Sequence, residues 1–440
     1  MRTLAAFFLC CSSLSILGQS AANDAKSRLE ATLRSDLRYL QELYVNLHRT
    51  PELSFLEEET AKRVAQELKS AGFEVSEKVG FHGVVGVLRN GDGPVVLLRT
   101  DMDALPVKEQ TGLPYASTKK QVNTTGEEVP VMHACGHDLH MSAVIGTARF
   151  LARNKDLFSG TVVVIGQSAE ERGSGARAML KAGLFERFPK PDYCLALHVH
   201  SGLEVGKVGY VPGYMMANVD MVDVTIRGVG GHGAYPHLAK DPVVLASEAV
   251  VALQTLISRE KKAGDPGVLT VGSIHGGTKH NIIPDEVKLQ LTLRSYSDSV
   301  RSNMIAGINR VTRGLAIAAG LPEDRMPVVT VLEDEFTPAT YNDPKLTERW
   351  MKALESWLGK NAVVQDEPQM GGEDFSEYGR TGDKIPICLL WLGSVPAEKI
   401  KEGKAPSIHS PFYHPEPEGS IRMGVTALSA AALELLKKGK

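Results

Sequence analysis

Short apolar runs alternate with helical patterns over the first half of the chain. The runs GVVGVLR, PVVLLRT, TVVVIGQ and YCLALHV are typical of buried strands, and segments with apolar residues at helical spacing separate them. Two helices are expected before the first strand, one from Ala25 to Leu47 and one that ends at Gly72, with Ser54 and Glu57 as its capping box. Strands that alternate with helices predict an α/β fold whose mainly parallel, mixed sheet has helices on both faces.

The middle of the chain shows a different pattern, a strict alternation of apolar and polar residues. In EVKLQLTLRS every apolar side chain falls on one face of the strand, so the other face is expected to be solvated. A helix started by Asp241, a strand GVLTVGSI and a helix from about Ser299 to Ala319 complete most of a ferredoxin-like unit. We therefore predict an α+β ferredoxin-like domain at 215–330, inserted into a catalytic domain formed by 23–214 and 331–440.

Composition and charge exclude several classes of protein. The 440 residues are 43% hydrophobic and 23% charged, which suits a folded chain with a large core rather than a disordered or fibrous one. A formal net charge of −3 provides no basic field, so nucleic acid is not expected as a partner.

The first residues have the order of a secretory signal peptide. MRTLAAFFLCCSSLSILGQSAANDAK begins with one positive charge, continues with an apolar run and reaches small residues around Ser20 to Ala22. The apolar run is too short and too often broken by serine for a spanning helix, and FFLC lacks the small residue that a lipoprotein anchor needs. We expect residues 1–22 to be removed and the chain to be exported, to the periplasm or beyond, without a membrane anchor.

The cysteines form an odd set once that segment is removed. Cys135, Cys194 and Cys388 remain, so at most one disulfide could form in an oxidising compartment. A metal-bound thiolate would explain one of them. For Cys194 and Cys388, each inside an apolar run, a buried free thiol is the preferred interpretation.

Metal-type ligands gather at the expected ends of the strands. In open α/β sheets the site lies beyond the carboxyl ends of the strands. Cysteine together with histidine favours zinc or a similar transition ion over calcium or magnesium. The residues concerned are Asp101 and Asp103, Glu170 and Glu171, His198 and His200, joined by Cys135, His137 and His140 of MHACGHDLH.

Glu170 and Glu171 are adjacent carboxylates with two possible interpretations. Taken alone, the pair fits an exposed acidic start of a helix, favoured by the helix dipole. Its position at the end of a strand favours a division of roles, with one residue as metal ligand and the other as general base.

At this point the sequence resembles a known family. LLRTDMDALPV, MHACGHDLHMSAVIGTARFL, SAEE, ALHV, GVGGHGAYPH, HNIIPDEV and GGEDFSEY occur in the order seen in the N-acyl-amino-acid amidohydrolases of the aminoacylase and carboxypeptidase metallopeptidase family. The branch it is most similar to contains the hippurate hydrolases and the indole-acetyl-amino-acid hydrolases. The resemblance covers essentially the whole chain after the signal peptide.

The resemblance implies a role for several positions. Two divalent metal ions, zinc or manganese with cobalt as a further candidate, would be bound, and Glu170 would be the general base. His232 of the inserted domain would stabilise the oxyanion, reaching the partner's site in a homodimer formed through that domain. Asn281 and Arg294 would hold the substrate carboxylate, and Asp103 would orient a histidine ligand. The implied metal ligands are Cys135, His137, Glu171, His198 and His409.

Two departures from the family pattern bear on specificity and on the branch. EERGSGA places Arg172 beside the metal rim where relatives have a run of glycines, so this side chain either turns outward, narrows the pocket or binds an acidic group. Cys135 takes the place of the bridging aspartate of the wider carboxypeptidase family. His140 remains open between a metal-site role and support of the following helix.

The expected activity is hydrolysis of the amide bond of an N-acyl or N-aroyl amino acid, with a metal-activated water and Glu170 as general base. A metallo-dipeptidase or carboxypeptidase is the alternative among enzymes. A catalytically silent relative that binds N-acyl amino acids is the alternative outside that class, and the presence of Glu170 argues against it.

Overall fold

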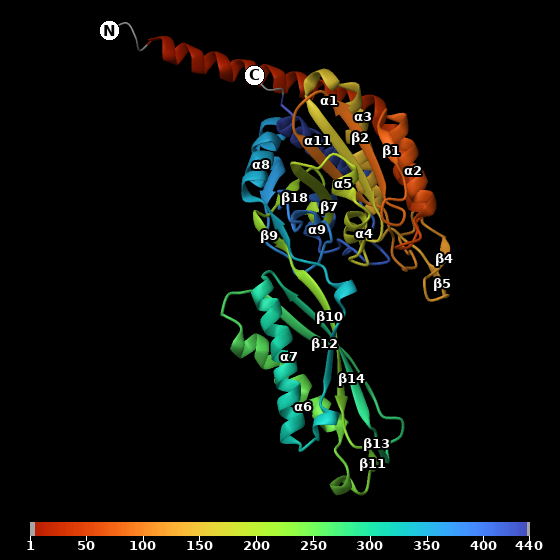
Figure 1. Ribbon diagram of the computed structural model, residues 1–440. Helices are drawn as coiled ribbons and strands as arrows, with labels where there is room; N and C mark the ends of the chain where they lie inside the picture. Colours follow the sequence, from red (N-terminus) through yellow and green to blue (C-terminus); the bar gives the residue numbers. More distant parts are fainter. Residues whose placement is uncertain (1–4, 438–440) are drawn as a thin grey trace. The chain divides into compact units, whose positions relative to one another are not determined.

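The computed structural model describes the backbone of residues 5–437 and the side chains of residues 23–437. The predicted signal peptide lies outside the residues with described side chains, so it stays a prediction. The chain divides into two compact units, and each is described by itself (Figure 1). The larger unit comprises Met1–Gly213, Asn342–Glu367 and Glu377–Lys440, and the smaller unit comprises Tyr214–Tyr341 and Pro368–Ser376.

An eight-stranded mixed sheet forms the centre of the larger unit. Its strand order is β1-β2-β6-β3-β7-β18-β8-β17. The four central strands, β6, β3, β7 and β18, are parallel to their neighbours within this group, and antiparallel pairs occur on both sides of it. The α/β prediction is therefore confirmed. The strands are β1 (Glu74–Ser76), β2 (Val84–Asn90), β3 (Val95–Asp101), β6 (Gly160–Gln167), β7 (Tyr193–Glu204), β8 (Val208–Tyr210), β17 (Val363–Gln365) and β18 (Ile387–Val395).

Helices cover both faces of this sheet because its central strands are apolar on both sides. On one face α1, α2, α3, α8 and α11 share a core cluster with alternate strand residues such as Leu98 and Val164. On the other face α4 packs against β6 (Figure 1). Phe185 of α5 contacts Tyr378 of α9. The helices of the larger unit are α1 (Ala5–Arg49), α2 (Glu58–Ser70), α3 (His137–Arg153), α4 (Gly175–Lys181), α5 (Leu184–Arg187), α8 (Pro344–Leu358), α9 (Ser376–Gly379), α10 (Ala397–Lys401) and α11 (Pro417–Leu435).

The smaller unit is a four-stranded antiparallel sheet with two helices. Its strand order is β12-β14-β10-β15, and the apolar face of β14 packs against α6 and α7. The ferredoxin-like prediction is confirmed. The unit continues to Tyr341, beyond the predicted 330, because β15 pairs with β10 and Thr337, further along, bridges Val219 of the same strand. Its elements are β10 (Asn218–Arg227), β11 (Gly231–His232), α6 (Pro242–Thr255), β12 (Gly267–Gly276), β13 (Ile282–Ile283), β14 (Glu286–Ser295), α7 (Asp298–Ala318) and β15 (Val328–Val331).

Three short pairs complete the strand inventory of the described chain. The hairpin formed by β4 (Lys120–Val122) and β5 (Glu128–Pro130) belongs to the larger unit, and β11 pairs with β13 in the smaller one. The strands β9 (Gly213–Met216) and β16 (Thr340–Asn342) form a two-stranded sheet.

Within the described residues one helical segment, Pro242–Glu260, is long and apolar enough to cross a membrane. It consists of α6 and the turn that follows, and its residues Leu245, Ala249 and Leu253 belong to the core of the smaller unit. A core helix passes the same test of length and composition.

The predicted capping box at the start of α2 is wrong. The helix begins at Glu58, and no side chain of the residue before it, Glu57, caps it. The hydroxyl of Ser54 donates instead to Asp103 Oδ2 at 2.7 Å. The carboxylate of Glu52 accepts from the backbone N–H of Thr60 at 2.7 Å and so takes the capping role from a more distant position.

Cys194 and Cys388 are free thiols on neighbouring strands. In the register of β7 and β18, Cys194 lies opposite Ile387, and Cys388 lies opposite Leu195. The two cysteines are thus offset by one residue, so their side chains point to opposite faces of the sheet. No disulfide can join them, which agrees with the prediction of buried free thiols.

Candidate metal centre

The candidate metal centre lies at the carboxyl edge of the central strands of the larger unit. Asp101 ends β3, the Glu170–Glu171 pair follows β6, and His198 lies on β7. Because β6, β3 and β7 are parallel neighbours, these residues reach the same edge of the sheet. The first turn of α3 and the loop before it bring Cys135 and His137 to this edge.

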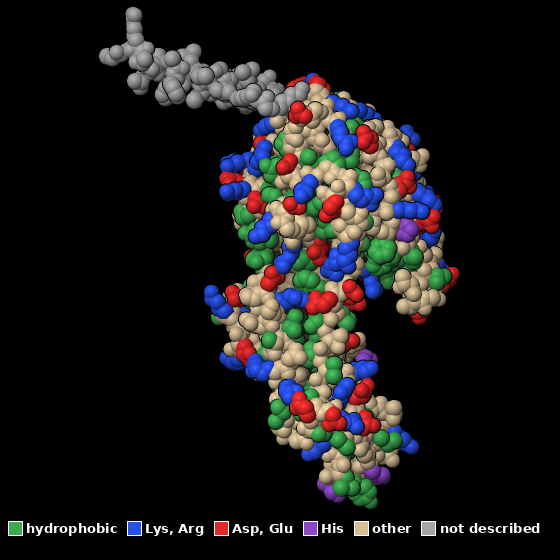
Figure 2. Space-filling view, in the orientation of Figure 1, with side chains coloured by type: hydrophobic (Ala, Val, Ile, Leu, Met, Phe, Trp, Pro, Cys, Tyr) green, Lys and Arg blue, Asp and Glu red, His purple; other side chains and the backbone are tan. Residues whose placement is uncertain are grey.

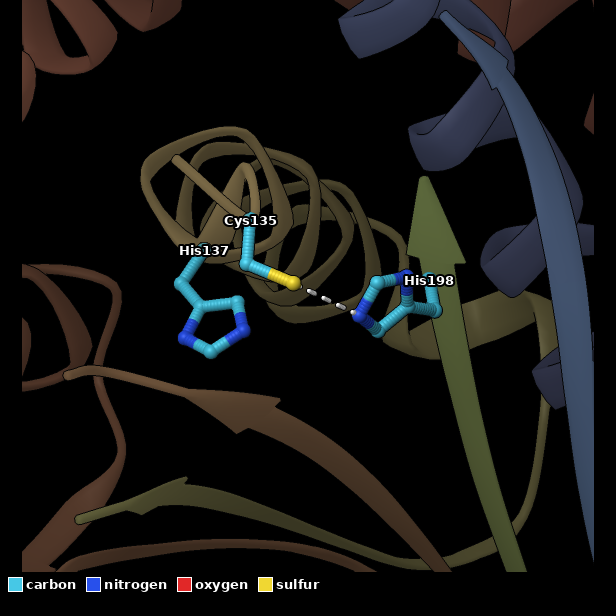
Figure 3. Close-up of side chains that lie close together, drawn as sticks. All are labelled: Cys135, His137 and His198. Atoms are coloured by element: carbon cyan, nitrogen blue, oxygen red, sulfur yellow. Dashed lines mark hydrogen bonds between the residues drawn. The ribbon is translucent and has the colours of Figure 1, made fainter. Parts of the chain in front are cut away.

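Cys135 is the centre of one cluster of ligand atoms. Its Sγ lies 3.4 Å from His198 Nε2 (Figure 3) and 3.2 Å from His409 Nε2. His409 comes from a loop far along the chain and is held by its own N–H, which donates to the carbonyl of Ala134 at 2.8 Å. Cys135 and His198 are buried, whereas about half of the His409 side chain is exposed.

The paired glutamates face His137. His137 Nε2 lies 3.9 Å from Glu170 Oε2 and 4.0 Å from Glu171 Oε1, and Glu171 Oε1 also lies 3.5 Å from His409 Nε2. Both carboxylates are about 90% buried and stand in a turn rather than at the start of a helix. The exposed acidic pair weighed from the sequence is therefore not what the structure shows. The structure brings the five predicted ligands and Glu170 together in the larger unit.

Hydrogen bonds orient the imidazole rings toward one another. His137 Nδ1 donates to the carbonyl of Asp103 at 2.8 Å, and His198 Nδ1 donates to the carbonyl of Val199 at 2.8 Å. In both rings Nδ1 is therefore held by a backbone carbonyl, and Nε2 is the nitrogen that a metal ion would use. Asp103 also accepts from the N–H of Glu171 at 3.0 Å, so the aspartate expected to orient a ligand contacts two of them.

The charges of the site favour a bound cation. Burial lowers the pKa of His137, but the charges of Asp101 and Asp103 outweigh this effect and raise that pKa to about 10. Burial and the charges of Glu171 and Glu170 raise the pKa of the Cys135 thiol well above its ordinary value. The pocket thus holds protons where a divalent cation could replace them.

Unpaired buried atoms test whether the residues fit metal ions. His137 Nε2, Glu171 Oε1 and Asp103 Oδ1 are buried and make no hydrogen bond to a described residue. Such atoms are costly unless something else satisfies them. The first two belong to groups whose ligand atoms lie within 4.8 Å of one another, namely Cys135–His137–His198, Cys135–Glu171–His409 and His137–Glu170–Glu171. The donor set suits a transition ion, so the residues fit the expected metals.

Asp101 and His140 form a buried pair behind the ligands. Asp101 Oδ1 accepts from His140 Nδ1 at 2.7 Å, and Asp101 Oδ2 pairs with Arg99 Nη1 at 2.6 Å and lies 3.6 Å from His137 Nε2. His140 Nε2 accepts from the N–H of Val199 at 2.9 Å. Both ring nitrogens of His140 are therefore occupied, so the structure favours a supporting role for this residue.

Glu57 holds the turn that carries the paired glutamates. Its Oε1 accepts from the N–H of Ala169 at 2.7 Å, and Ala169 has a left-handed backbone with φ of +54°. With Asp103 on the N–H of Glu171, two buried carboxylates fix the backbone on either side of Glu170. The sequence pattern predicted for Glu57 only a place in a capping box. Its burial, which decides its role, depends on a segment more than a hundred residues away.

A second buried network supports the start of α3. His48, at the end of α1, lies 2.7 Å from Asp138 Oδ2 and 3.1 Å from Glu109 Oε1. Burial lowers the pKa of His48, but the two carboxylates outweigh it and raise that pKa to about 9. A charged imidazolium therefore joins three distant segments beside His137. No sequence pattern could have predicted this role, because a lone histidine at the end of a helix has no characteristic pattern.

The remaining predicted residues lie elsewhere. His232, Asn281 and Arg294 belong to the smaller unit, where β11 pairs with β13 and places His232 one register position from Asn281. Arg294 lies on the more polar face of β14, and burial lowers its pKa. Arg172 is exposed, which favours the outward orientation among the three considered.

Comparison with known proteins decides the family. The sequence pattern of peptidase family M20/M25/M40 matches residues 97–434. The chain belongs to this family. It is 36% identical to a hippurate hydrolase of Campylobacter jejuni over 76% of this chain and 82% of that protein. It is 34% identical to thermostable carboxypeptidase 1 of Saccharolobus solfataricus over 92% of this chain and 98% of that protein.

A solved structure gives the same answer for the fold. A dinuclear metal-binding peptidase of the M20 family from Bacillus subtilis superposes with a TM-score of 0.75 at 28% identity, covering 92% of this chain and 99% of that one. The resemblance stated from the sequence motifs is therefore confirmed, and this M20 family chain is a hydrolase of the amidohydrolase and peptidase type.

Proposed function

We propose that this M20 family enzyme hydrolyses the amide bond of N-acyl or N-aroyl amino acids and uses two divalent metal ions. The observation that carries the proposal is the convergence of Cys135, His137, Glu171, His198 and His409 on one edge of the sheet. The similarity to a hippurate hydrolase supports the substrate class, and the similarity to a dinuclear metal-binding peptidase supports the number of ions.

The five ligand residues would hold the two ions, with zinc, manganese and cobalt all compatible with this donor set. When bound, the ions polarise the amide carbonyl and make a water molecule acidic enough to attack near neutral pH. Cys135 and His137 would give up their protons on binding. Asp103 and the carbonyl of Val199 keep the two imidazoles aligned throughout.

Glu170 would act as the general base. Its Oε2 lies 3.9 Å from His137 Nε2, and it is not among the five proposed ligands, so its carboxylate would accept a proton from the attacking water. The same carboxyl then donates that proton to the nitrogen of the leaving amino acid. The anchoring of Ala169 and Glu171 on either side keeps this carboxylate in place during both transfers.

Residues of the smaller unit would complete the reaction. His232 would donate to the developing oxyanion, acting across a homodimer, and Asn281 and Arg294 would bind the substrate carboxylate. The guanidinium of Arg294 is partly buried, which strengthens a charge-assisted hydrogen bond to a carboxylate. Export after removal of residues 1–22 belongs to the same proposal.

The test is release of free glycine from N-benzoyl-glycine by the purified chain loaded with manganese or zinc. Activity should require the metal and disappear with a chelator. Glu170→Gln should lower kcat by about 10²–10⁴-fold with metal content unchanged. Glu127→Gln, an exposed glutamate in the turn between β4 and β5, is the matched control and should keep full activity. Glu170→Gln protein with near-normal kcat would contradict the assigned role.

A carboxypeptidase activity is the second candidate, because the similarity to thermostable carboxypeptidase 1 extends over 98% of that protein. Peptides with and without a free α-amine, assayed beside the N-acyl series, separate the two activities. Turnover of peptides alone would replace the first candidate by the second.

A further inference from the structure

Two phenylalanines in loops at the carboxyl edge of the central sheet have left-handed backbones. Phe55 has φ of +69° and Phe81 has φ of +59°, and their rings pack edge to face with centroids 4.7 Å apart. A bulky side chain in this region of backbone space is strained. Such strain persists only where the surroundings hold it, and it gathers at ligand-binding sites.

The surroundings of both residues are rigid and belong to the catalytic edge. Phe55 follows Ser54, whose hydroxyl donates to Asp103. Phe81 lies just before β2, and β2 runs antiparallel to β6 with Val84 opposite Gly166. The loop before β2 therefore reaches the edge of the sheet where β6 leads into the Glu170 turn.

Close packing fixes the loop that carries Phe81. A Cβ on Gly80 would lie 2.6 Å from the backbone of Ala178, so the loop lies directly on α4. The hydroxyl of Ser168, two residues before Glu170, lies 3.4 Å from the carbonyl of Gly80. The backbone next to Phe81 is thus fixed against the segment that leads into the Glu170 turn.

The ring of Phe81 does not serve the core. The residue is 57% exposed and belongs to no core cluster of the described chain. Figure 2 shows hydrophobic side chains gathered on this face of the larger unit near the first turn of α2. A strained backbone that presents an exposed aromatic ring lowers stability without improving the packing, which indicates that the ring has another role.

We propose that Phe55 and Phe81 form a platform that binds the acyl group of the substrate and makes the enzyme prefer aromatic acyl groups. This inference rests on the proposed amidohydrolase function. The exposed ring of Phe81 offers its face and edge to an aryl group, whereas a methyl group such as that of an acetyl substrate gains little from it.

The experiment compares kcat/KM for N-benzoyl-glycine and N-acetyl-glycine in three forms of the metal-loaded, full chain. The forms are wild type, Phe81→Gly and Phe412→Ala. Glycine adopts φ of +59° without strain, so Phe81→Gly removes the ring while the loop keeps its shape. Phe412 is the matched control, because it is also about half exposed and lies in the loop after His409.

Phe81→Gly should lower the benzoyl-to-acetyl ratio of kcat/KM about threefold to tenfold with the melting temperature unchanged or raised. Phe412→Ala should leave the ratio unchanged. An unaltered ratio in Phe81→Gly, or a ratio that falls only in Phe412→Ala, overturns the platform. If wild type hydrolyses neither substrate but cleaves peptides, the proposed function fails instead, so the two failures are distinguishable.

Discussion

Glu57→Gln tests the buried support of the catalytic turn. Glu57 is fully buried and accepts the N–H of Ala169. Burial, with a further contribution from the charge of Asp103, raises the pKa of Glu57 from 4.5 to about 8. Near neutral pH the folded, metal-free protein therefore keeps a proton on Glu57 that the unfolded chain has released. Glutamine mimics this protonated carboxyl and still accepts the N–H of Ala169.

The magnitude follows from the difference between the two pKa values. Since the folded state binds the extra proton between pH 4.5 and about 8, the free energy of unfolding of the wild type falls as pH rises through this window. The slope approaches about 1.4 kcal/mol per pH unit and the loss sums to about 5 kcal/mol. Glutamine does not titrate. The free energy of unfolding of Glu57→Gln, relative to that of wild type, should therefore increase with pH at this slope.

The assay is denaturant unfolding of both proteins after removal of metal, at pH 6, 7 and 8. The free energy of unfolding of Glu57→Gln should rise by about 1 kcal/mol relative to that of wild type with each pH unit. Glu57→Ala is the control for the hydrogen bond, because it leaves the N–H of Ala169 buried and unpaired and should cost about 1–3 kcal/mol at every pH. A difference between wild type and Glu57→Gln that stays constant with pH would show that Glu57 is ionised in the folded protein and would refute the reasoning.

Three further predictions concern the ligands and their supports. Metal binding at pH 7 should release protons, because Cys135 and His137 both have pKa values above 7 in the metal-free protein. Metal affinity should therefore rise with pH. A metal titration in weak buffer that detects no proton release would contradict this prediction. Asp103→Asn should weaken metal binding or activity about 10–100-fold in a protein that still folds, as measured by competition with a chromophoric chelator, and unchanged affinity and activity would remove its orienting role. His48→Ala should cost about 3–5 kcal/mol of stability at pH 6, because it strips the positive charge from between two buried carboxylates. This contribution is fully present below about pH 6.5 and is lost as pH rises through 9, so in denaturant unfolding the two proteins should converge at high pH; a gap that does not narrow would contradict the assignment.

The sequence predicted those parts of the fold that depend on local pattern. The predicted apolar runs form β2, β3, β6 and β7, and the alternating segment in the middle of the chain forms β14. These strands were predictable because a strand buried on both faces is apolar throughout, and a strand buried on one face alternates apolar and polar residues. The convergence of ligands was predictable for a similar reason, since parallel strands end at a common edge.

Side chains whose roles depend on distant packing could not be predicted. Ser54 and Glu57 match a capping box in sequence, but in the structure Ser54 donates to Asp103 and Glu57 accepts from Ala169. These contacts form only when segments distant in the sequence meet, so the local pattern does not predict them. The charge of His48 depends in the same way on carboxylates 61 and 90 residues away in the chain. The spacing of residues within a motif does not predict contacts between such distant segments.

The opposite orientation of Cys194 and Cys388 separates the folding of the chain from the redox state of its surroundings. With no bridge possible between them, the free energy of unfolding gains nothing from an oxidising compartment and loses nothing in a reducing one. Cys135 is the one thiol of the three that lies among the metal ligands, and its burial and raised pKa make it a poor target for oxidants in the metal-free protein. Chain produced under reducing conditions therefore needs no disulfide between Cys194 and Cys388 to reach the folded state.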